Sequence, residues 1–187
     1  MAGGANDGGA NGKARQFRDL VLPHLDDVYT LARFLTDGAS EAEDAAQECF
    51  LRAFRHFDSY RGPAIKPWLL AILRNACRAV HAKNAGLVYT DAGTADVAGA
   101  APPIWSEPAD TPERLVLRQH DTDAMRRLIE NLPPEFREVI VLREINDLSY
   151  REIATVIDVP IGTVMSRLAR GRALLRDTWI AAEGDLT

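Results

Sequence analysis

The stretch VPIGTVMSRLARGRALLR, residues 159–176, combines hydroxyl and guanidinium side chains in a pattern that suits contact with nucleic acid. It holds four arginines and no acidic residue, although the chain of 187 residues has a formal net charge of −5. At about 100° per residue, two hydroxyls and two guanidinium groups share one helical face: Thr163, Ser166, Arg167 and Arg170. Such groups can donate hydrogen bonds to phosphate oxygens and to guanine. A solvated amphipathic helix would show the same pattern, so the stretch alone leaves both interpretations open.

The residues in front of this helix predict a helix-turn-helix motif. Ser149, followed three residues later by Glu152, predicts a capping box at the start of a short helix. Residues 158–160, Asp-Val-Pro, predict a tight turn before the next helix. In such a motif the second helix enters the major groove of DNA, with its first turns near the base edges. The combination favours DNA binding over a solvated helix.

The remaining residues of the helix and two nearby arginines have less definite roles. On the side opposite the hydroxyls we expect an apolar stripe of Ile161, Val164, Met165, Leu168 and Leu175. Arg172 and Arg176 fall nearer this stripe, and we expect their stems to lie along it while the charged ends reach phosphate or solvent. Arg143 and Arg151, outside the helix, either contact phosphate or form surface ion pairs.

Charge elsewhere in the chain is sorted into blocks. Residues 37–48 carry five acids and no base, and residues 91–110 are acidic as well. Between them, residues 59–90 have no acid and carry five cations: Arg61, Lys66, Arg74, Arg78 and Lys83. Blocks of both signs predict partners of both signs, which the net charge alone would have hidden.

No residue pattern indicates catalysis, a metal site or a cofactor. The four histidines are scattered, no Ser-His-Asp arrangement or Gly-rich phosphate loop appears, and the chain therefore reads as a non-enzyme. Cys49 and Cys77 lack metal-ligand spacing, and we expect buried reduced thiols. No apolar run approaches the ~18 residues of a membrane helix, and the first residues lack a signal pattern, which predicts a cytoplasmic protein without membrane insertion.

Hydrophobic periodicity predicts an all-α chain of two small helical domains joined by a flexible linker. We expect a disordered leader over residues 1–15, a first domain over 16–84, an acidic linker over 85–112 and a second domain over 113–183. A structureless run as long as this linker would be unusual inside one compact domain.

Local signals predict several helix boundaries. Pro23 should kink or restart the first helix, and Ser40 with Glu43 should form a capping box for a helix that ends at Phe57. Residues 58–67 should form a loop before the next helix. A helix start near Pro112 is expected in the second domain.

Two sequence strings carry a resemblance to a known family. LPPEFREVIVLREINDLSYREIATVIDVPIGTVMSRLARGRALLRD resembles region 4 of bacterial sigma factors, which reads the −35 promoter element. AEDAAQECFLRAFRHFDSYRG and WLLAILRNACRAVHAK resemble region 2. Two such regions in this order, with a short linker, are similar to the extracytoplasmic-function (ECF) sigma factors of the sigma-70 family. The resemblance implies two helical domains that bind core RNA polymerase, through its β′ and β subunits, and promoter DNA.

The resemblance also implies roles for individual residues. Contacts with the −35 element are expected from Thr163, Ser166, Arg167, Arg170, Arg143 and Arg151. Contacts with the −10 element are expected from Arg61, Lys66, Trp68, Arg74, Asn75 and Arg78, where cations hold the backbone and Asn75 bonds a base edge. Trp68 either offers a stacking surface or belongs to the core. Binding to core polymerase is expected from Asp44, Gln47, Glu48 and Leu51.

Departures and rival functions complete the sequence-based picture. Met165 stands where relatives often have a basic residue, and Pro67 where they more often have a polar one. The resemblance further implies control by an anti-sigma factor. The alternatives are a helix-turn-helix transcriptional regulator, which would leave the basic block without a role, and a sigma mimic that binds an anti-sigma factor.

Overall fold

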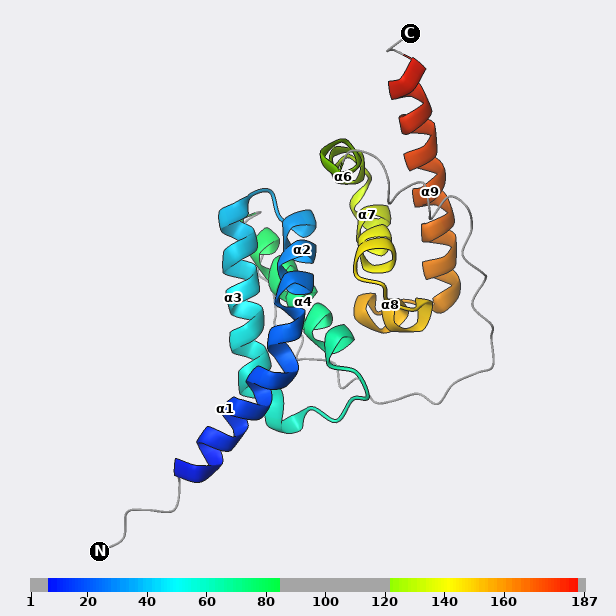
Figure 1. The fold of residues 1–187 in the computed structure, drawn as a ribbon. Helices are drawn as coiled ribbons and strands as arrows, with labels where there is room; N and C mark the ends of the chain where they lie inside the picture. Colours follow the sequence, from blue (N-terminus) through cyan, green and yellow to red (C-terminus); the bar gives the residue numbers. More distant parts are fainter. Residues whose placement is uncertain (1–6, 85–121, 185–187) are drawn as a thin grey trace, which may run out of the picture. The chain divides into compact units, whose positions relative to one another are not determined.

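A computed structural model describes residues 7–84 and 122–184 of the chain. These residues divide into two units, within Met1–Val97 and Ala98–Thr187, and both are built from helices, with no strand in either described range (Figure 1). The prediction of an all-α chain with two helical domains is therefore confirmed. The expected linker and the helix start near Pro112 lie outside the described residues. No described helix combines the length and apolar character needed to cross a membrane.

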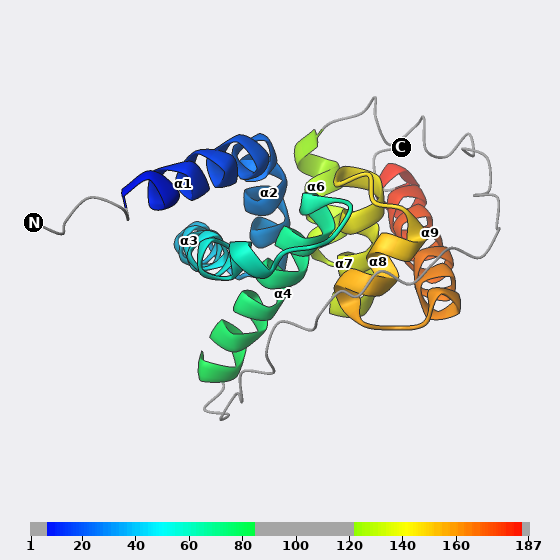
Figure 2. The same cartoon turned by 90° about the horizontal axis from the view of Figure 1, so that it is seen from below.

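The first unit is a helical bundle. Its long helices α2, α3 and α4 lie side by side in both views (Figures 1 and 2). Pro23 falls in a short 3-10 turn that separates α1 from α2, as its fixed φ and missing N–H predict. In chain order the elements are α1 (Asp7–Val21), η1 (Leu22–His24), α2 (Leu25–Leu35), α3 (Ala39–His56), η2 (Phe57–Ser59) and α4 (Ile65–Asn84).

Helix α1 corrects the expectation of a disordered leader over residues 1–15, because the helix already begins at Asp7. Aromatic contacts fix it to the bundle: the Phe17 ring lies edge-on to Phe54 and Phe57, with centroids 5.1 and 5.2 Å away. Lys13 adds an ammonium group 5.1 Å from the centre of the Phe54 ring. The Gly- and Ala-rich composition pointed to disorder, and these tertiary contacts outweigh it.

Two helix starts differ from the sequence prediction. Gly38, in extended backbone, precedes α3 without any side-chain cap, so Ser40 lies inside the helix and the predicted capping box is wrong. The start of α4 at Ile65 places Lys66 and Pro67 in its first turn instead of a loop. A proline is tolerated there because the first backbone N–H groups of a helix have no intrahelical acceptor.

Small residues let α3 approach its neighbours in the core of the first unit. Its buried face consists of Ala42, Ala45, Ala46, Cys49 and Ala53. The Cys49 thiol lies 3.4 Å from the Leu69 carbonyl oxygen, and burial raises the pKa of this thiol. Cys49 and Cys77 are both buried, as expected, and neither forms a disulfide within the described residues.

The second unit packs a long C-terminal helix against several short elements. They are α6 (Thr122–Glu130), α7 (Pro134–Ile140), the π-helical turn η3 (Val141–Ile145), α8 (Tyr150–Ile157) and α9 (Ile161–Gly184). Gly171 marks the closest approach of α9 to α7, since a Cβ there would lie 3.0 Å from Ile140 Cγ1. A side chain at this position would require Ile140 to shift by a few tenths of an ångström, so the glycine allows α9 and α7 to pack closely.

Candidate nucleic-acid and polymerase interface

Helices α8 and α9 form the helix-turn-helix that the sequence predicted. The Ser149 hydroxyl oxygen accepts a hydrogen bond from the backbone N–H of Glu152 at 3.3 Å. In return, the Glu152 carboxylate accepts one from the Ser149 N–H at 2.8 Å, which completes the capping box. Asp158 ends α8 in the left-handed region, at φ 54°. The turn is closed by the Thr163 N–H, which donates to the Pro160 carbonyl at 2.8 Å.

The exposed face of α9 is rotated relative to the prediction. Its buried positions are Val164, Leu168, Gly171 and Leu175. Because Gly171 points inward, Ser166 and Arg170 are exposed, whereas Thr163 and Arg167 are half-buried at the edge of that face. Ile161 and Met165, expected in the buried stripe, are 40% and 48% exposed. The predicted stripe is therefore wrong at these two positions.

The polar side chains of this face differ in the hydrogen bonds and ion pairs that they form within the protein. The Ser166 hydroxyl donates to the Thr163 carbonyl oxygen at 3.0 Å, which leaves its lone pairs outward. Arg167 and Arg170 make no ion pair within residues 7–84 and 122–184. Their guanidinium groups are thus available for an anionic partner.

Arg143 and Arg151 have different surroundings. Arg143 is only 8% exposed, and its Nη1 donates to the Leu148 carbonyl at 2.9 Å. Its guanidinium carbon also lies 5.1 Å from the centre of the Tyr150 ring, so the group supports the loop before α8. Arg151 on α8 is exposed. We retain Arg151 and omit Arg143 from the DNA contacts proposed below.

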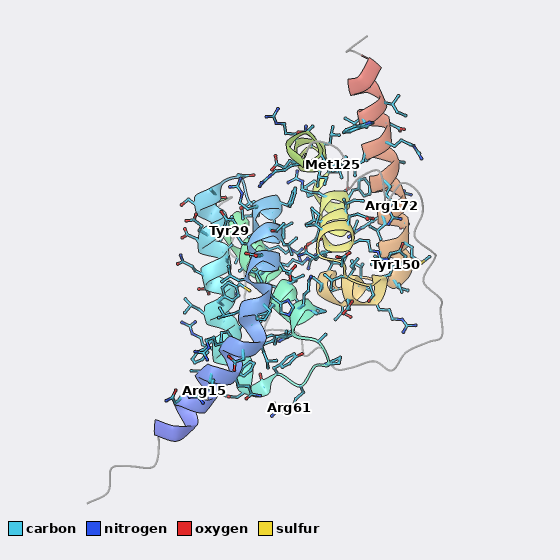
Figure 3. The ribbon with its side chains drawn as sticks, viewed as in Figure 1. Arg15, Tyr29, Arg61, Met125, Tyr150 and Arg172 are labelled. Atoms are coloured by element: carbon cyan, nitrogen blue, oxygen red, sulfur yellow. The ribbon has the colours of Figure 1, made fainter. Side chains whose placement is uncertain are left out.

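Arg172 forms a link inside the unit instead of reaching phosphate or solvent. Its Nε and Nη2 lie 3.1 and 2.6 Å from the same Glu144 carboxylate oxygen. Glu144 belongs to the π-helical turn η3. Arg172 and Tyr150 are labelled in Figure 3. Burial alone would lower the pKa of Arg172, but hydrogen bonds to Glu144 and Tyr150 raise it above its ordinary value. Through Glu144 on η3 and Tyr150 at the start of α8, Arg172 links the middle of α9 to both of these elements.

In the first unit, Lys66 is held by an acidic neighbour. Its Nζ lies 2.9 Å from one carboxylate oxygen of Asp27, and His24 Nδ1 lies 3.1 Å from the other. Burial of Asp27 opposes ionisation, yet the hydrogen bonds from Lys66 and His24 keep its pKa below the ordinary value. Lys66 therefore has a competing internal partner for any phosphate.

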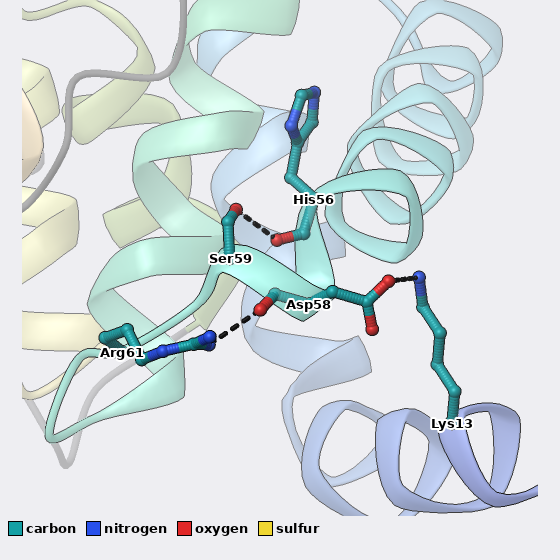
Figure 4. A network of polar contacts seen from close by, with 5 residues as sticks. All are labelled: Lys13, His56, Asp58, Ser59 and Arg61. Carbon is teal, nitrogen blue, oxygen red and sulfur yellow. Dashed lines mark hydrogen bonds and ion pairs between the residues drawn. The ribbon is translucent and has the colours of Figure 1, made fainter. Parts of the chain in front are cut away.

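The loop before α4 carries a second predicted cation, Arg61, and an aromatic residue, Tyr60, that contacts Trp68 on α4. Arg61 Nη1 donates to the carbonyl oxygens of Asp58 and Tyr60 at 2.6 and 2.8 Å, while Lys13 pairs with the Asp58 carboxylate (Figure 4). The rings of Tyr60 and Trp68 lie 4.9 Å apart, and Trp68 is half-buried. Burial also raises the pKa of Tyr60. Trp68 thus keeps part of its surface at the protein exterior.

The other two predicted surfaces lie along single helices. On α4, Arg78 is exposed, while Arg74 and Asn75 are half-buried. On α3, Asp44 and Gln47 are exposed, and Leu51 beside them is 54% exposed. Glu48 is half-buried and accepts a hydrogen bond from Arg52 Nε at 2.7 Å. An exposed leucine among acidic and amide groups suits a basic helical partner with an apolar contact point.

Several residues of these surfaces are not evident from the sequence. Asp27 contacts Lys66, Tyr60 contacts Trp68, and Glu144 contacts Arg172. The sequence pattern singles out none of these three partners. Alternation of hydropathy gives no signal for such pairs. For Tyr60, the sequence does offer one signal, the glycine at position 62. A Cβ on Gly62 would lie 2.9 Å from the Tyr60 ring, so the glycine leaves room for this ring. Within the described ranges, no cluster of three or more His, Cys, Asp or Glu side chains could hold a metal ion.

Comparison with known proteins identifies the class. Residues 20–85 match sigma-70 region 2, and residues 122–175 match sigma-70 region 4. The chain therefore belongs to the sigma-70 family, as the sequence strings indicated.

Comparison with individual relatives assigns the chain to one group within the sigma-70 family. It is 35% identical over 164 residues to the ECF RNA polymerase sigma factor SigW of Bacillus subtilis, covering 86% of this chain and 87% of that protein. It is 33% identical over 169 residues to the ECF RNA polymerase sigma-E factor of Escherichia coli, covering 86% and 85%. Identity to SigE of Mycolicibacterium smegmatis is 35% over 162 residues, but the match spans only 60% of that longer protein. The chain is a member of the ECF sigma factors, and the rival classes of regulator and mimic are not favoured.

Solved structures agree on the fold. The sigma factor RpoE of Bartonella quintana, in complex with the anti-sigma factor NepR, gives a TM-score of 0.62 at 24% identity over 87% of this chain and 96% of that one. CnrH, in complex with the cytosolic domain of CnrY, gives 0.62 at 25% identity over 92% of each chain. The two-domain helical architecture is thus that of known sigma factors.

Proposed function

We propose that this protein is a cytoplasmic, non-enzymatic promoter-specificity subunit whose two units read two promoter elements for core RNA polymerase. The observation that supports this best is the helix-turn-helix, in which the exposed face of α9 over residues 161–171 carries Ser166 and Arg170 and no acidic side chain. Ser166, Arg167 and Arg170 contact the −35 element, Thr163 lies at the edge of the contact, and Arg151 binds phosphate. Arg170 suits a guanine, since its fork matches guanine O6 and N7.

The −10 contact is assigned to α4 and the loop before it. Arg78 is exposed, Arg74 and Asn75 lie beside it on α4, and Arg61 occupies the loop. Trp68, backed by Tyr60, offers an aromatic surface for an unstacked base. Lys66 contributes only if a phosphate competes successfully with Asp27.

Binding to core polymerase is assigned to the exposed face of α3. Leu51 serves as the apolar contact, and Asp44, Gln47 and Glu48 complement cationic groups on the β′ subunit. The β subunit is the second expected polymerase contact. The Bartonella quintana sigma factor and CnrH were both solved with an anti-sigma factor, and we propose one for this chain too.

A transcription assay tests the proposal. Purified core RNA polymerase is incubated with genomic DNA fragments, with and without the protein, and run-off transcripts are sequenced. We expect new transcripts whose start sites share two upstream elements. Leu51→Asp should abolish them together with co-elution on core polymerase, whereas Arg170→Ala should retain co-elution but lose −35-dependent transcripts. No protein-dependent transcript and no co-elution would refute the proposal.

A further inference from the structure

The exposed surface of α9 is divided into a polar and an apolar strip. Ser166 and Arg170, four residues apart, form the polar strip. Ile161, Met165 and Ala169, also spaced by four, form an exposed apolar strip between the polar strip and the buried face. Ile161 and Met165 are 40% and 48% exposed, and both lie in the first turns of α9, the part of such a helix that meets the base edges.

Apolar side chains on a DNA-reading face have one counterpart among the base edges. The major-groove edges of the four base pairs present hydrogen-bond donors and acceptors, and thymine adds a C5-methyl group. Methionine suits such a contact because its unbranched thioether chain adapts to the shape of its partner. A basic side chain at the same position would instead select guanine.

We propose that Met165 is a specificity-determining residue that packs against the C5-methyl group of a thymine in the −35 element, with Ala169 extending the same apolar contact. This inference rests on the proposed function of α9. It predicts that the protein distinguishes thymine from uracil at one base pair. Ser166 and Arg170, on the adjacent strip, read the neighbouring phosphate or purine and do not depend on that methyl group.

Selection from DNA pools tests the inference with the protein bound to core RNA polymerase. Two duplex pools share one randomised segment at the −35 position, one made with thymine and the other with uracil. Wild-type holoenzyme should enrich thymine at one position, and the uracil pool should lose that enrichment. On the best duplex, replacing that thymine by uracil should weaken binding about fourfold, the value of one buried methyl-sized group.

Variants connect the effect to the side chain. Met165→Ala should discriminate less between the thymine and uracil duplexes than wild type, because only the smaller Ala169 contact remains, and Met165→Arg should shift the enriched base to guanine. Leu174→Ala is the matched control, since Leu174 is 38% exposed on the same helix but lies beyond its first turns. This control should keep the wild-type preference for thymine.

Three outcomes overturn the inference, and the first can be told apart from the other two. If wild-type holoenzyme enriches no sequence at all, the proposed role of α9 fails together with the role of Met165. If it enriches a sequence but tolerates uracil at every position, or if Met165→Ala keeps the full thymine preference, only the inference fails. The apolar strip would then be assigned to a protein partner.

Discussion

The ion pair between Glu144 and Arg172 permits a quantitative test of how α9 is held. Replacing Arg172 by methionine keeps the aliphatic length but leaves the Glu144 carboxylate without its guanidinium partner. The side chains of Glu144 and Arg172 are 10% and 35% exposed, so the pair is only partly screened by water. Breaking a fully buried pair costs about 3–5 kcal/mol, and the exposure of Arg172 reduces this to about 2–3 kcal/mol.

Tryptophan fluorescence can isolate the effect in the second unit. The chain has three tryptophans, and replacing Trp68 and Trp105 by phenylalanine leaves Trp179 on α9 as the single reporter. Urea unfolding in that background should show a loss of about 2–3 kcal/mol for Arg172→Met. The corresponding fall in melting temperature is about 10–20 °C for a domain of this size. Arg176→Met, at an exposed position of the same helix, should change stability by less than about 0.5 kcal/mol.

A double variant shows whether the cost arises from the buried carboxylate that loses its guanidinium partner. Glu144→Gln removes that charge, so the combination with Arg172→Met should cost clearly less than the sum of the two single changes. Strict additivity would refute the argument, as would equal costs for Arg172→Met and Arg176→Met. Either result would mean that α9 is held by its apolar contacts alone.

Other predictions concern packing, pH and binding. Gly171→Ala should destabilise the second unit by about 1 kcal/mol in urea unfolding, since overpacking against α7 exceeds the gain in helix propensity. Gly162→Ala, whose Cβ would meet nothing within 4 Å, should stabilise it by up to about 1 kcal/mol. The lowered pKa of Asp27 stabilises the folded chain above its unfolded-state value, near 3.8, and this contribution disappears as pH falls through the lower folded-state value. The stability difference between wild type and Asp27→Asn should therefore shrink on acidification below about pH 4 in urea titrations. Leu51→Ala should weaken binding to core polymerase in a pull-down assay, with an unchanged melting temperature because Leu51 is 54% exposed.

The sequence was sufficient where the relevant signal is local. The capping box of Ser149 and Glu152, the restart at Pro23 and the apolar spacing of the helices each depend on residues within about one turn of one another. Helix α1 before residue 15 was missed because tertiary contacts of Lys13 and Phe17 hold it.

The missed parts of the site depend on contacts between distant residues. Glu144 and Arg172 are 28 positions apart, and the partner of Lys66 lies 39 positions away on another helix. The orientation of α9 was misjudged because glycine has no apolar side chain, so Gly171 contributed nothing to the predicted stripe although it faces the core.

The close contact at Gly171 has a consequence for how promoter preference can change over evolution. Gly171 belongs to the buried side of α9, with Val164, Leu168 and Leu175, and this side packs without the side chains of the outer face at Met165, Ser166 and Ala169. Substitutions on the outer face therefore alter recognition with little effect on folding, whereas a substitution at Gly171 acts on the packing of α9 against α7. Under the proposed function, a diverging lineage can retarget this protein to new promoters by single replacements, without compensating mutations in its core.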